Sequence, residues 1–385
     1  MNMSGPIEGV VAPGFEPVRD AFVGNFERPG DYQECGAALA VFHRGQLVVD
    51  LWGGYADMNR SRKWTRDTLV NVWSTTKGVV ATAVAMLVDR GLIRYEDNLA
   101  YIWPEFAEAG KQGITLAHVL SHQAGLPGFV EPTRIEDQYD WQQCCAKLVR
   151  QSPIWEPGTA TSYHAMTYGW LAGEVIRRLS GKAVRQFIQD EIAAPMRADI
   201  FIGVPGSEEH RLAHTIPPRN PAKLPPLPQA AMMALTNPEQ DASAANTAPW
   251  RKAEIPAANG HASAIALARL YTFLVEGGEQ EGVRLLSPQV VDKMRAAATR
   301  DRTDMFLGFK DSWGMGMALN SPGIYGPNPQ AFGHSGWGGS FACADPAARI
   351  AIGYVCNRMG PDLVGDPRTR ALCNAVFSSR PLEAN

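Results

Sequence analysis

Strand-like segments lie near both ends of this 385-residue chain, with mostly helical sequence between them, and this distribution restricts the fold more than any other feature. Residues 36–42 and 46–52 alternate in polarity around Arg44-Gly45, so they predict a hairpin. Further strands are expected over residues 313–319, 331–342 and 349–355, with an opening helix over 17–28 and a closing helix over 368–378. The sequence therefore predicts an α+β fold, in which a helical insertion divides one sheet.

This arrangement divides the chain into a discontinuous sheet domain, residues 1–85 and 285–385, and a mostly helical domain, residues 86–284. With 45% hydrophobic residues, the chain can bury a core large enough for two domains. Residues 203–259 are rich in Pro and Ala. A long structureless stretch is commonly a functional loop or disordered. We expect this segment either to form a wall or lid of a substrate pocket or to be a surface excursion.

Ser74-Thr75-Thr76-Lys77 stands where an extended apolar segment, residues 67–73, meets a helical pattern that Gly91 is expected to end. Ser74 should begin this helix, with Lys77 one turn later on the same face. A serine needs a base before it can attack a carbonyl, and a desolvated lysine can serve. Taken alone, the motif also fits a serine N-cap beside a solvated lysine.

Two later motifs carry compatible chemistry. Tyr163-His164-Ala165 follows a turn and precedes a helical run, so Tyr163 is expected on a loop where a phenol could exchange protons. His334-Ser335-Gly336-Trp337 lies in a glycine-rich strand region, where a substrate could approach the backbone closely. A packed tyrosine and a purely structural hairpin are the alternatives. Each motif is weak evidence alone, but their order is specific for a serine acyl-transfer enzyme.

This ordered set resembles that of class C β-lactamases and, more narrowly, of the β-lactamase-like carboxylesterases called family VIII. Residues 116–129, 155–159 and 258–274 match other stretches of that family, and the resemblance spans roughly residues 20 to 375. It implies a β-lactamase/penicillin-binding-protein fold. An antiparallel sheet would be flanked by N- and C-terminal helices and joined to a mostly helical inserted domain, with the site at their junction.

The resemblance also implies the roles of individual residues. Ser74 would be the nucleophile, with Lys77 and Tyr163 as a proton-handling pair. The backbone N–H groups of Ser74 and Trp337 would form the oxyanion hole. The residues expected to bind substrate are Phe129, His334, Ser335, Gly336 and Gly338.

Three positions depart from the β-lactamase pattern. Ala165 replaces an asparagine that helps to hold the β-lactam amide, and His334 replaces a lysine that helps to bind the substrate carboxylate. Phe129 stands where class C enzymes have a polar amide. A site without these polar partners discriminates against substrates that need them. The departures therefore favour esters over penicillins and cephalosporins.

Composition fits a soluble enzyme. A net charge of −3 gives no reason to expect nucleic acid or an anionic membrane as a partner. The first residues have no basic flank followed by an apolar run, so a cytoplasmic location without a membrane span is expected. His210 and His214 have helical spacing but lack the Glu of a zinc motif, and neither metal nor cofactor is expected. The six cysteines are expected to be reduced and packed.

The leading interpretation is a carboxylesterase that cleaves small, fairly apolar esters through a Ser74 acyl-enzyme, with Tyr163 passing the proton to the leaving alkoxide. An acyltransferase could use the same site if an alcohol or amine replaced water. The alternatives are a β-lactamase or D-amino-acid peptidase, which would need a cationic group near His334, and a non-catalytic binding protein.

Overall fold

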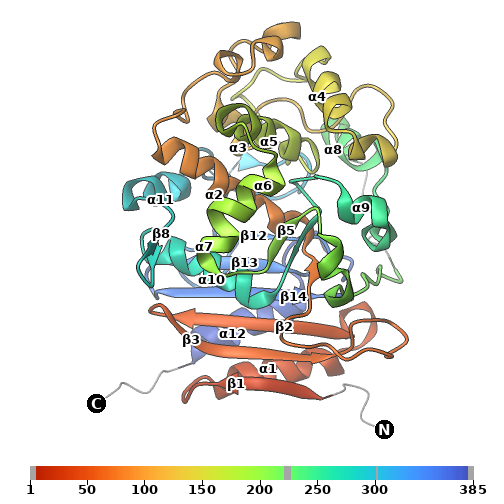
Figure 1. The fold of residues 1–385 in the computed structure, drawn as a ribbon, viewed down its shortest axis with the longest axis vertical. Coiled ribbons are helices and arrows are strands. Elements are labelled where there is room, and N and C mark those ends of the chain that lie inside the picture. The colour runs from red at the N-terminus through yellow and green to blue at the C-terminus, as the bar shows by residue number, and fades with distance from the viewer. Residues whose placement is uncertain (1–5, 221–226, 301, 380–385) are drawn as a thin grey trace.

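A seven-stranded sheet forms the centre of the molecule. The computed structural model describes residues 6–220, 227–300 and 302–379. All neighbouring strands of this sheet are antiparallel, in the order β1-β3-β2-β14-β13-β12-β11 (Figure 1). The strands are β1 (Ile7–Val11), β2 (Gly36–His43), β3 (Gln46–Gly54), β11 (Ala318–Leu319), β12 (Phe332–Ser335), β13 (Phe341–Asp345) and β14 (Ile350–Cys356). Because β2 pairs with β14, the two ends of the chain join in one sheet, as predicted.

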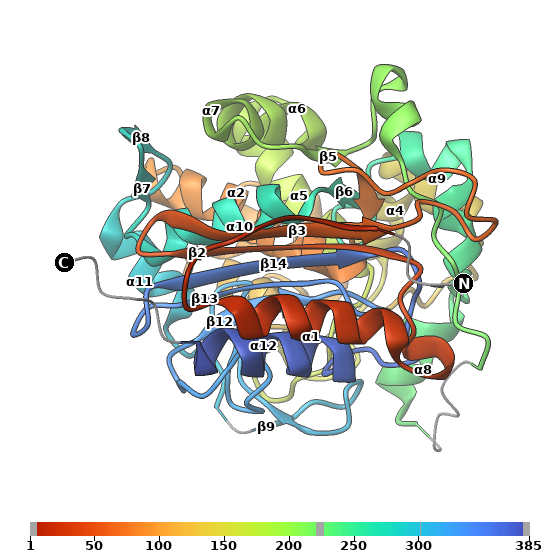
Figure 2. The ribbon, with the colours of Figure 1, turned by 90° about the horizontal axis from the view of Figure 1, so that it is seen from below.

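Helices cover both faces of the sheet. Helices α1 (Glu16–Glu27) and α12 (Pro367–Ser378) contact each other on one face, while α10 (Ala264–Val275) packs against β14, β2 and β13 on the other (Figure 2). Beyond α10 lie α2 (Thr76–Asp89) and α5 (Thr167–Ser180), which contact each other. The predicted opening and closing helices are confirmed to within two residues.

The predicted hairpin is confirmed, and two strand predictions need correction. Arg44 and Gly45 both have positive φ, 50° and 75°, as the tight turn between β2 and β3 requires. The single strand expected over 331–342 is two strands, β12 and β13, because a loop at residues 336–340 turns the chain back on itself. Only β11 forms within 313–319, where Gly316 has a φ of 82°. The edge strand β1 was not predicted.

The remaining elements surround the sheet and helices just described. The helices are α3 (Leu116–Leu120), α4 (Trp141–Arg150), α6 (Val184–Ile188), α7 (Ala194–Met196), α8 (Gln229–Thr236), α9 (Ala248–Lys252) and α11 (Pro288–Arg295). The short strands are β4 (Val70–Asn71), β5 (Ile200–Ile202), β6 (Gly260–Ala262), β7 (Glu279–Gln280), β8 (Val283–Arg284), β9 (Arg302–Thr303) and β10 (Lys310–Asp311). Within the described ranges no helix is long and apolar enough to cross a bilayer.

The region 203–259 is not structureless. It contains α8 and α9, although residues 221–226 of its proline-rich part lie outside the described residues. The division into residues 1–85 with 285–385 and residues 86–284 stays a prediction. Helix α10 belongs to the second segment but packs on the sheet of the first.

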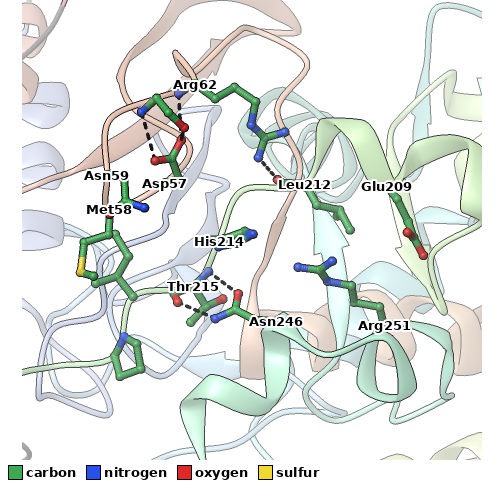
Figure 3. A pocket seen from close by; sticks show the side chains of 13 residues that line it. Asp57, Met58, Asn59, Arg62, Glu209, Leu212, His214, Thr215, Asn246 and Arg251 are labelled. Carbon is green, nitrogen blue, oxygen red and sulfur yellow. Dashed lines mark hydrogen bonds between the residues drawn. The ribbon is translucent and has the colours of Figure 1, made fainter.

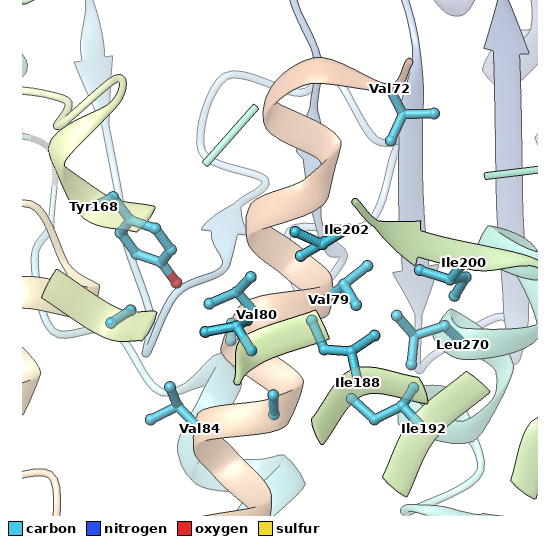
Figure 4. Close-up of a cluster of buried hydrophobic side chains, with 14 of the residues drawn as sticks. Val72, Val79, Val80, Val84, Tyr168, Ile188, Ile192, Ile200, Ile202 and Leu270 are labelled. Carbon is cyan, nitrogen blue, oxygen red and sulfur yellow. The ribbon is translucent and has the colours of Figure 1, made fainter. Parts of the chain in front are cut away.

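Helix α2 is the most deeply buried element near the sheet. Every residue from Thr76 to Leu87 is buried. Figure 4 shows side chains of α2 among those of α5, β5, α10 and the segment that follows α6. The figure labels Val79, Val80 and Val84 of α2. Around them it labels Tyr168, Ile188, Ile192, Ile200, Ile202 and Leu270. Because packing surrounds α2, the position of its first turn is fixed by the core.

Glycine at position 353 allows α10 to approach the sheet closely. A Cβ on Gly353 would lie 2.4 Å from the Ala264 carbonyl oxygen and 2.5 Å from the Ala268 nitrogen. We expect Gly353→Ala to lower the free energy of unfolding by about 1–3 kcal/mol, because the helix must move away. Urea unfolding followed by tryptophan fluorescence would measure this change.

Gly24 in α1 is the matched control, because nothing lies within 4 Å of a Cβ built on it. Gly24→Ala should keep the wild-type stability or raise it by up to about 1 kcal/mol, since alanine favours a helix. Equal stability of the Gly353→Ala variant and the wild type would contradict this account of the contact between α10 and the sheet.

Candidate active site

Ser74 lies in a tight turn that joins β4 to α2. The 3-10 segment η2 (Trp73–Thr75) precedes α2, and the Val72 N–H donates to the Gly260 carbonyl oxygen at 2.8 Å. Trp73 has a φ of 47°, which is strained for a bulky residue. Its ring contacts those of Trp250 and Trp337, with centroids 5.4 and 5.1 Å away. Packing thus holds Ser74 at the start of the helical segment, as predicted.

Lys77 is completely buried and directed at Ser74. Its Nζ lies 3.0 Å from Ser74 Oγ, and it donates to the carbonyl oxygens of Ala165 at 2.7 Å and Ala257 at 2.9 Å. Among the described residues no carboxylate forms an ion pair with it. Burial places the Lys77 pKa well below its ordinary value.

The three contacts of Lys77 match the two N–H donors and the one lone pair of a neutral amine. A neutral NH₂ group has two N–H donors and one lone pair. Two carbonyl oxygens occupy the donors, so the lone pair faces the Ser74 hydroxyl. Lys111 offers a contrast, because its Nζ donates to three carbonyl oxygens and has no direction left for a lone pair. The surroundings of Lys77 therefore suit a base.

Tyr163 sits in an aromatic enclosure beside this pair. Its ring lies 4.7 Å from Lys77 Nζ, and it stacks on Trp313 with centroids 5.6 Å apart. Its backbone N–H donates to Asp304 Oδ1 at 3.1 Å. Burial raises the Tyr163 pKa well above its ordinary value, while the nearby Ser74 hydroxyl partly opposes this effect. The hydroxyl has no well-aligned protein partner among the described residues, so it rests as a neutral phenol facing Ser74.

His334 is neutral and buried at the end of β12. Burial, and secondarily the nearby Lys77, lowers its pKa to about 3. Its Nδ1 lies 3.0 Å from the Ser335 carbonyl oxygen, and its Nε2 has no protein partner among the described residues. The next side chain, Ser335, places Oγ 3.1 Å from Tyr325 Oη. His334 therefore supplies no cation where the β-lactamase pattern has a lysine.

The loop between β12 and β13 carries the second expected oxyanion donor. The N–H groups of Gly336, Gly338 and Gly339 donate to carbonyl oxygens, whereas that of Trp337 has no backbone acceptor in the described chain. Ser74 is the second residue of η2, so its N–H precedes the intrahelical bonds. Both donors remain available, as the sequence predicts for an oxyanion hole.

The glycines of this loop shape its backbone. A Cβ on Gly336 would lie 2.3 Å from both Ser340 Oγ and the Val72 carbonyl oxygen. Gly338 has a φ of 89°, and its carbonyl oxygen accepts from Arg368 Nη2 at 2.7 Å. Neither glycine lines the active-site cavity, although both were predicted to bind substrate.

Arg368 of α12 supports this loop from the opposite face of the sheet, and sequence reasoning missed it. Its side chain is completely buried, with Nη1 donating to Glu34 Oε1 at 3.0 Å and Nη2 donating to Asp366 Oδ2 at 2.6 Å. It also binds the Gly338 carbonyl oxygen described above. Asp304, which orients Tyr163, was missed as well. These residues lie far from the motifs in sequence, so no local pattern indicates them.

A cavity of about 340 Å³, the active-site cavity, opens in front of Ser74 and Tyr163. Its apolar walls include Met166, Leu235, Phe306, Leu307, Trp313 and Ile324, and its polar side chains include Ser335, Tyr325, Asp311 and Glu239. His334 and Trp337 also line it, as predicted.

Phe129 does not line this cavity, although it was expected to bind substrate. It is buried and packs against Trp170, with ring centroids 5.5 Å apart. Leu235, at the end of α8 in the region 203–259, does form part of the wall.

A second hollow, of about 630 Å³, lacks comparable chemistry. Figure 3 shows Asp57, Arg62 and Asn246, which line this hollow, engaged in hydrogen bonds with the fold. Asp57 accepts from the N–H groups of Ser61 and Arg62, and Arg62 donates to the Leu212 carbonyl oxygen. His214, from the rejected zinc motif, also lines this hollow. The active-site cavity is therefore the better candidate for catalysis.

Comparisons with known proteins agree with the resemblance that the motifs predicted. A family model described as Beta-lactamase matches residues 21–375. The chain is 36% identical to Esterase/beta-lactamase LipL of Mycobacterium tuberculosis, over 92% of this chain and 84% of that protein. The solved structure of a family VIII carboxylesterase is 44% identical with a TM-score of 0.91, covering 97% of this chain and 99% of that one. A penicillin-binding protein homolog from Caulobacter crescentus is 41% identical with a TM-score of 0.91, covering 97% of this chain and 100% of that one.

His164, beside Tyr163, is held in its neutral form and should make stability depend on pH. Its Nδ1 lies 2.7 Å from the Ser162 carbonyl oxygen, and its Nε2 accepts from the Leu126 N–H at 3.2 Å. Protonation of Nε2 would place its new N–H against the Leu126 N–H, so that two donors face each other. Burial lowers the His164 pKa to about 4. The unfolded chain binds this proton near its ordinary pKa of about 6.5, so stability is lost as the pH falls from about 6.5 towards 4.

Lowering the pH from 7 to 4.5 should reduce the free energy of unfolding of both proteins. We expect this loss to be about 2 kcal/mol smaller in His164→Gln than in the wild type. Denaturant unfolding at a series of pH values would measure this difference. His214→Gln is the control, because that side chain is exposed and should leave the wild-type pH dependence in place. Parallel pH profiles for wild type and His164→Gln would refute the assignment.

Proposed function

The chain belongs to the beta-lactamase family, and on that basis we propose that it is a carboxylesterase that cleaves small, fairly apolar esters through a Ser74 acyl-enzyme. The observation that carries this proposal is the contact between the buried Lys77 amino group and the Ser74 hydroxyl. Two carbonyl oxygens occupy the N–H donors of Lys77, and its third contact is Ser74 Oγ at 3.0 Å. A nucleophile with its base already in contact is the core of covalent acyl transfer.

In the first step, Lys77 Nζ takes the Ser74 proton while Oγ forms a bond to the ester carbonyl carbon. The N–H groups of Ser74 and Trp337 would stabilise the oxyanion of this tetrahedral intermediate. When the intermediate collapses, the bond to the alcohol oxygen breaks and the Tyr163 phenol gives its proton to the leaving alkoxide. The Lys77 ammonium then returns a proton to Tyr163. This leaves a neutral amine, a neutral phenol and an acyl-enzyme.

In the second step, water enters in place of the alcohol. Lys77 and Tyr163 now act in the opposite direction, so that water loses a proton as it attacks the acyl carbon and Ser74 regains one as it leaves. The opposite pKa shifts of Lys77 and Tyr163 support this division, since burial favours the neutral amine, which can accept a proton, and the neutral phenol, which can give one. An alcohol or amine could replace water, which would give acyl transfer.

The apolar cavity supports the choice of substrate. Its walls are mainly aromatic and aliphatic, and no Lys or Arg is among the described residues that line it. Penicillins and cephalosporins carry a carboxylate, which this cavity cannot pair with a cation. Hydrolysis of β-lactams is therefore the second candidate, carried by the family relationship and opposed by the charge of the cavity. A D-amino-acid peptidase, whose substrates carry a carboxylate too, is opposed for the same reason.

We expect Ser74→Ala to lower kcat/KM for a short-chain p-nitrophenyl ester at least about a thousandfold, because the nucleophile is lost. Tyr163→Phe should lower kcat about a hundredfold or more, since the leaving alkoxide loses its proton donor. Release of p-nitrophenolate measures both effects.

Tyr168→Phe is the matched control for Tyr163→Phe. Tyr168 is also buried and near Lys77, with Nζ 5.9 Å from its ring, and its hydroxyl also has no partner among the described residues. This variant should retain the wild-type rate within about threefold. If both phenylalanine variants lose the same activity, the assignment of Tyr163 as proton donor is wrong. Full activity of Ser74→Ala would refute the Ser74 acyl-enzyme. The measured activity would then come from another site or from a contaminating esterase, as expected for a non-catalytic scaffold.

The balance between esters and β-lactams is a separate test. We expect kcat/KM for nitrocefin to be at least about a hundredfold below that for a p-nitrophenyl ester, because the nitrocefin carboxylate finds no cation in the cavity. Both substrates release coloured products and can be compared on one preparation. Comparable or faster turnover of nitrocefin would make β-lactam hydrolysis the leading function.

A further inference from the structure

The active-site cavity contains a carboxyl group, that of Asp311, which has no ion-pair partner among the described residues and which the proposed mechanism does not use. Asp311, on β10, is 5% exposed and lines the cavity. Its Oδ1 accepts the Ser312 N–H at 2.7 Å. In the described chain, Oδ2 has no hydrogen-bond donor and Asp311 has no ion-pair partner. A buried carboxyl group is costly unless a donor or a cation satisfies it.

Among the residues that the structure describes, no positive charge lines the cavity beside this carboxyl group. The described lining residues include no Lys or Arg, and the His334 ring is held neutral. Lys77 contacts Ser74 but is itself shielded by two carbonyl oxygens. A second carboxyl group, that of Glu239, is exposed at the rim of the same cavity. When these two carboxyl groups are ionised, the electrostatic potential in the cavity is negative and favours a cation.

Aromatic rings surround the same space. Trp313, Phe306 and Phe309 line the cavity close to Asp311 in sequence, while Trp73 and Trp337 line it beside Ser74. The faces of aromatic rings attract ammonium groups, most strongly when the cation is desolvated. Rings combined with one unpaired carboxylate suit an alkylammonium group better than a neutral polar group or an anion.

We propose that Asp311 selects esters that carry a positively charged amine or quaternary ammonium group, which it binds inside the aromatic cavity. This inference rests on the proposed esterase function and specifies its substrate class. Asp311 acts on specificity, because it binds the substrate away from the carbonyl group that Ser74 attacks. The same arrangement excludes carboxylate-bearing substrates.

Binding can be tested without turnover by titrating choline and 3,3-dimethylbutan-1-ol in a calorimeter. These alcohols have the same shape and differ in whether nitrogen or carbon carries the methyl groups. At a pH above the Asp311 pKa of about 7, we expect the wild type to bind choline at least about tenfold more tightly. Asp311→Asn should abolish this preference. Glu281→Gln, which removes an exposed carboxyl group that does not line the cavity, should retain it.

Turnover provides the second measurement, with acetylcholine and 3,3-dimethylbutyl acetate as the matched esters. The ratio of their kcat/KM values should be at least about ten in the wild type and fall towards one in Asp311→Asn. Circular dichroism and thermal unfolding would establish that the variant is folded.

Three outcomes would overturn the inference: equal binding of the two alcohols, a ratio of one or less in the wild type, or a cation preference that survives Asp311→Asn. Failure of the esterase proposal would look different. In that case neither acetate nor any p-nitrophenyl ester would be cleaved, whereas calorimetry would still report whether the cavity prefers choline.

Discussion

Burial of α2 is the constraint on which the rest of this structure depends. The helix is enclosed along its length, so the amino group of Lys77 cannot reach water and must find its partners inside the protein. Two backbone carbonyl oxygens and the Ser74 hydroxyl meet that need. The same burial that stabilises the core thus lowers the Lys77 pKa and fixes the direction of its lone pair. Packing and reactivity have one physical cause.

The proposed catalytic groups come from distant parts of the chain, and buried contacts hold them next to one another. Trp73 and Trp337 place their rings 5.1 Å apart, which joins the turn before α2 to the loop after β12. On the other face of the sheet, Arg368 binds both Glu34 and the Gly338 carbonyl oxygen. An uncompensated charge at this depth would be strongly destabilising, so these contacts tie the C-terminal helix to the loop between β12 and β13.

Charge in the cavity explains how a fold shared with β-lactamases can favour another substrate. His334 occupies the lysine position of the β-lactamase pattern but stays neutral, since burial and Lys77 both oppose its protonation. The part of the lining that the structure describes has no Lys or Arg, and its acidic side chains are Asp311 and Glu239. In the proposed reaction, selectivity depends on which charges are left unpaired, whereas the proton transfers depend on Ser74, Lys77 and Tyr163.

The sequence by itself determined the order of the three motifs, the hairpin and the terminal helices, because these follow from local patterns. The antiparallel sheet was implied by the family resemblance that the ordered motifs carry. It also indicated that Ser74 begins a helical segment with Lys77 one turn later. It could not place Arg368, Asp304 or Asp311, and three residues that it assigned to substrate contact, Phe129, Gly336 and Gly338, do not line the cavity. Those positions depend on contacts between segments distant in sequence. Only the tertiary structure decided which side chains face the cavity, since burial, protonation and pairing arise after the chain has packed.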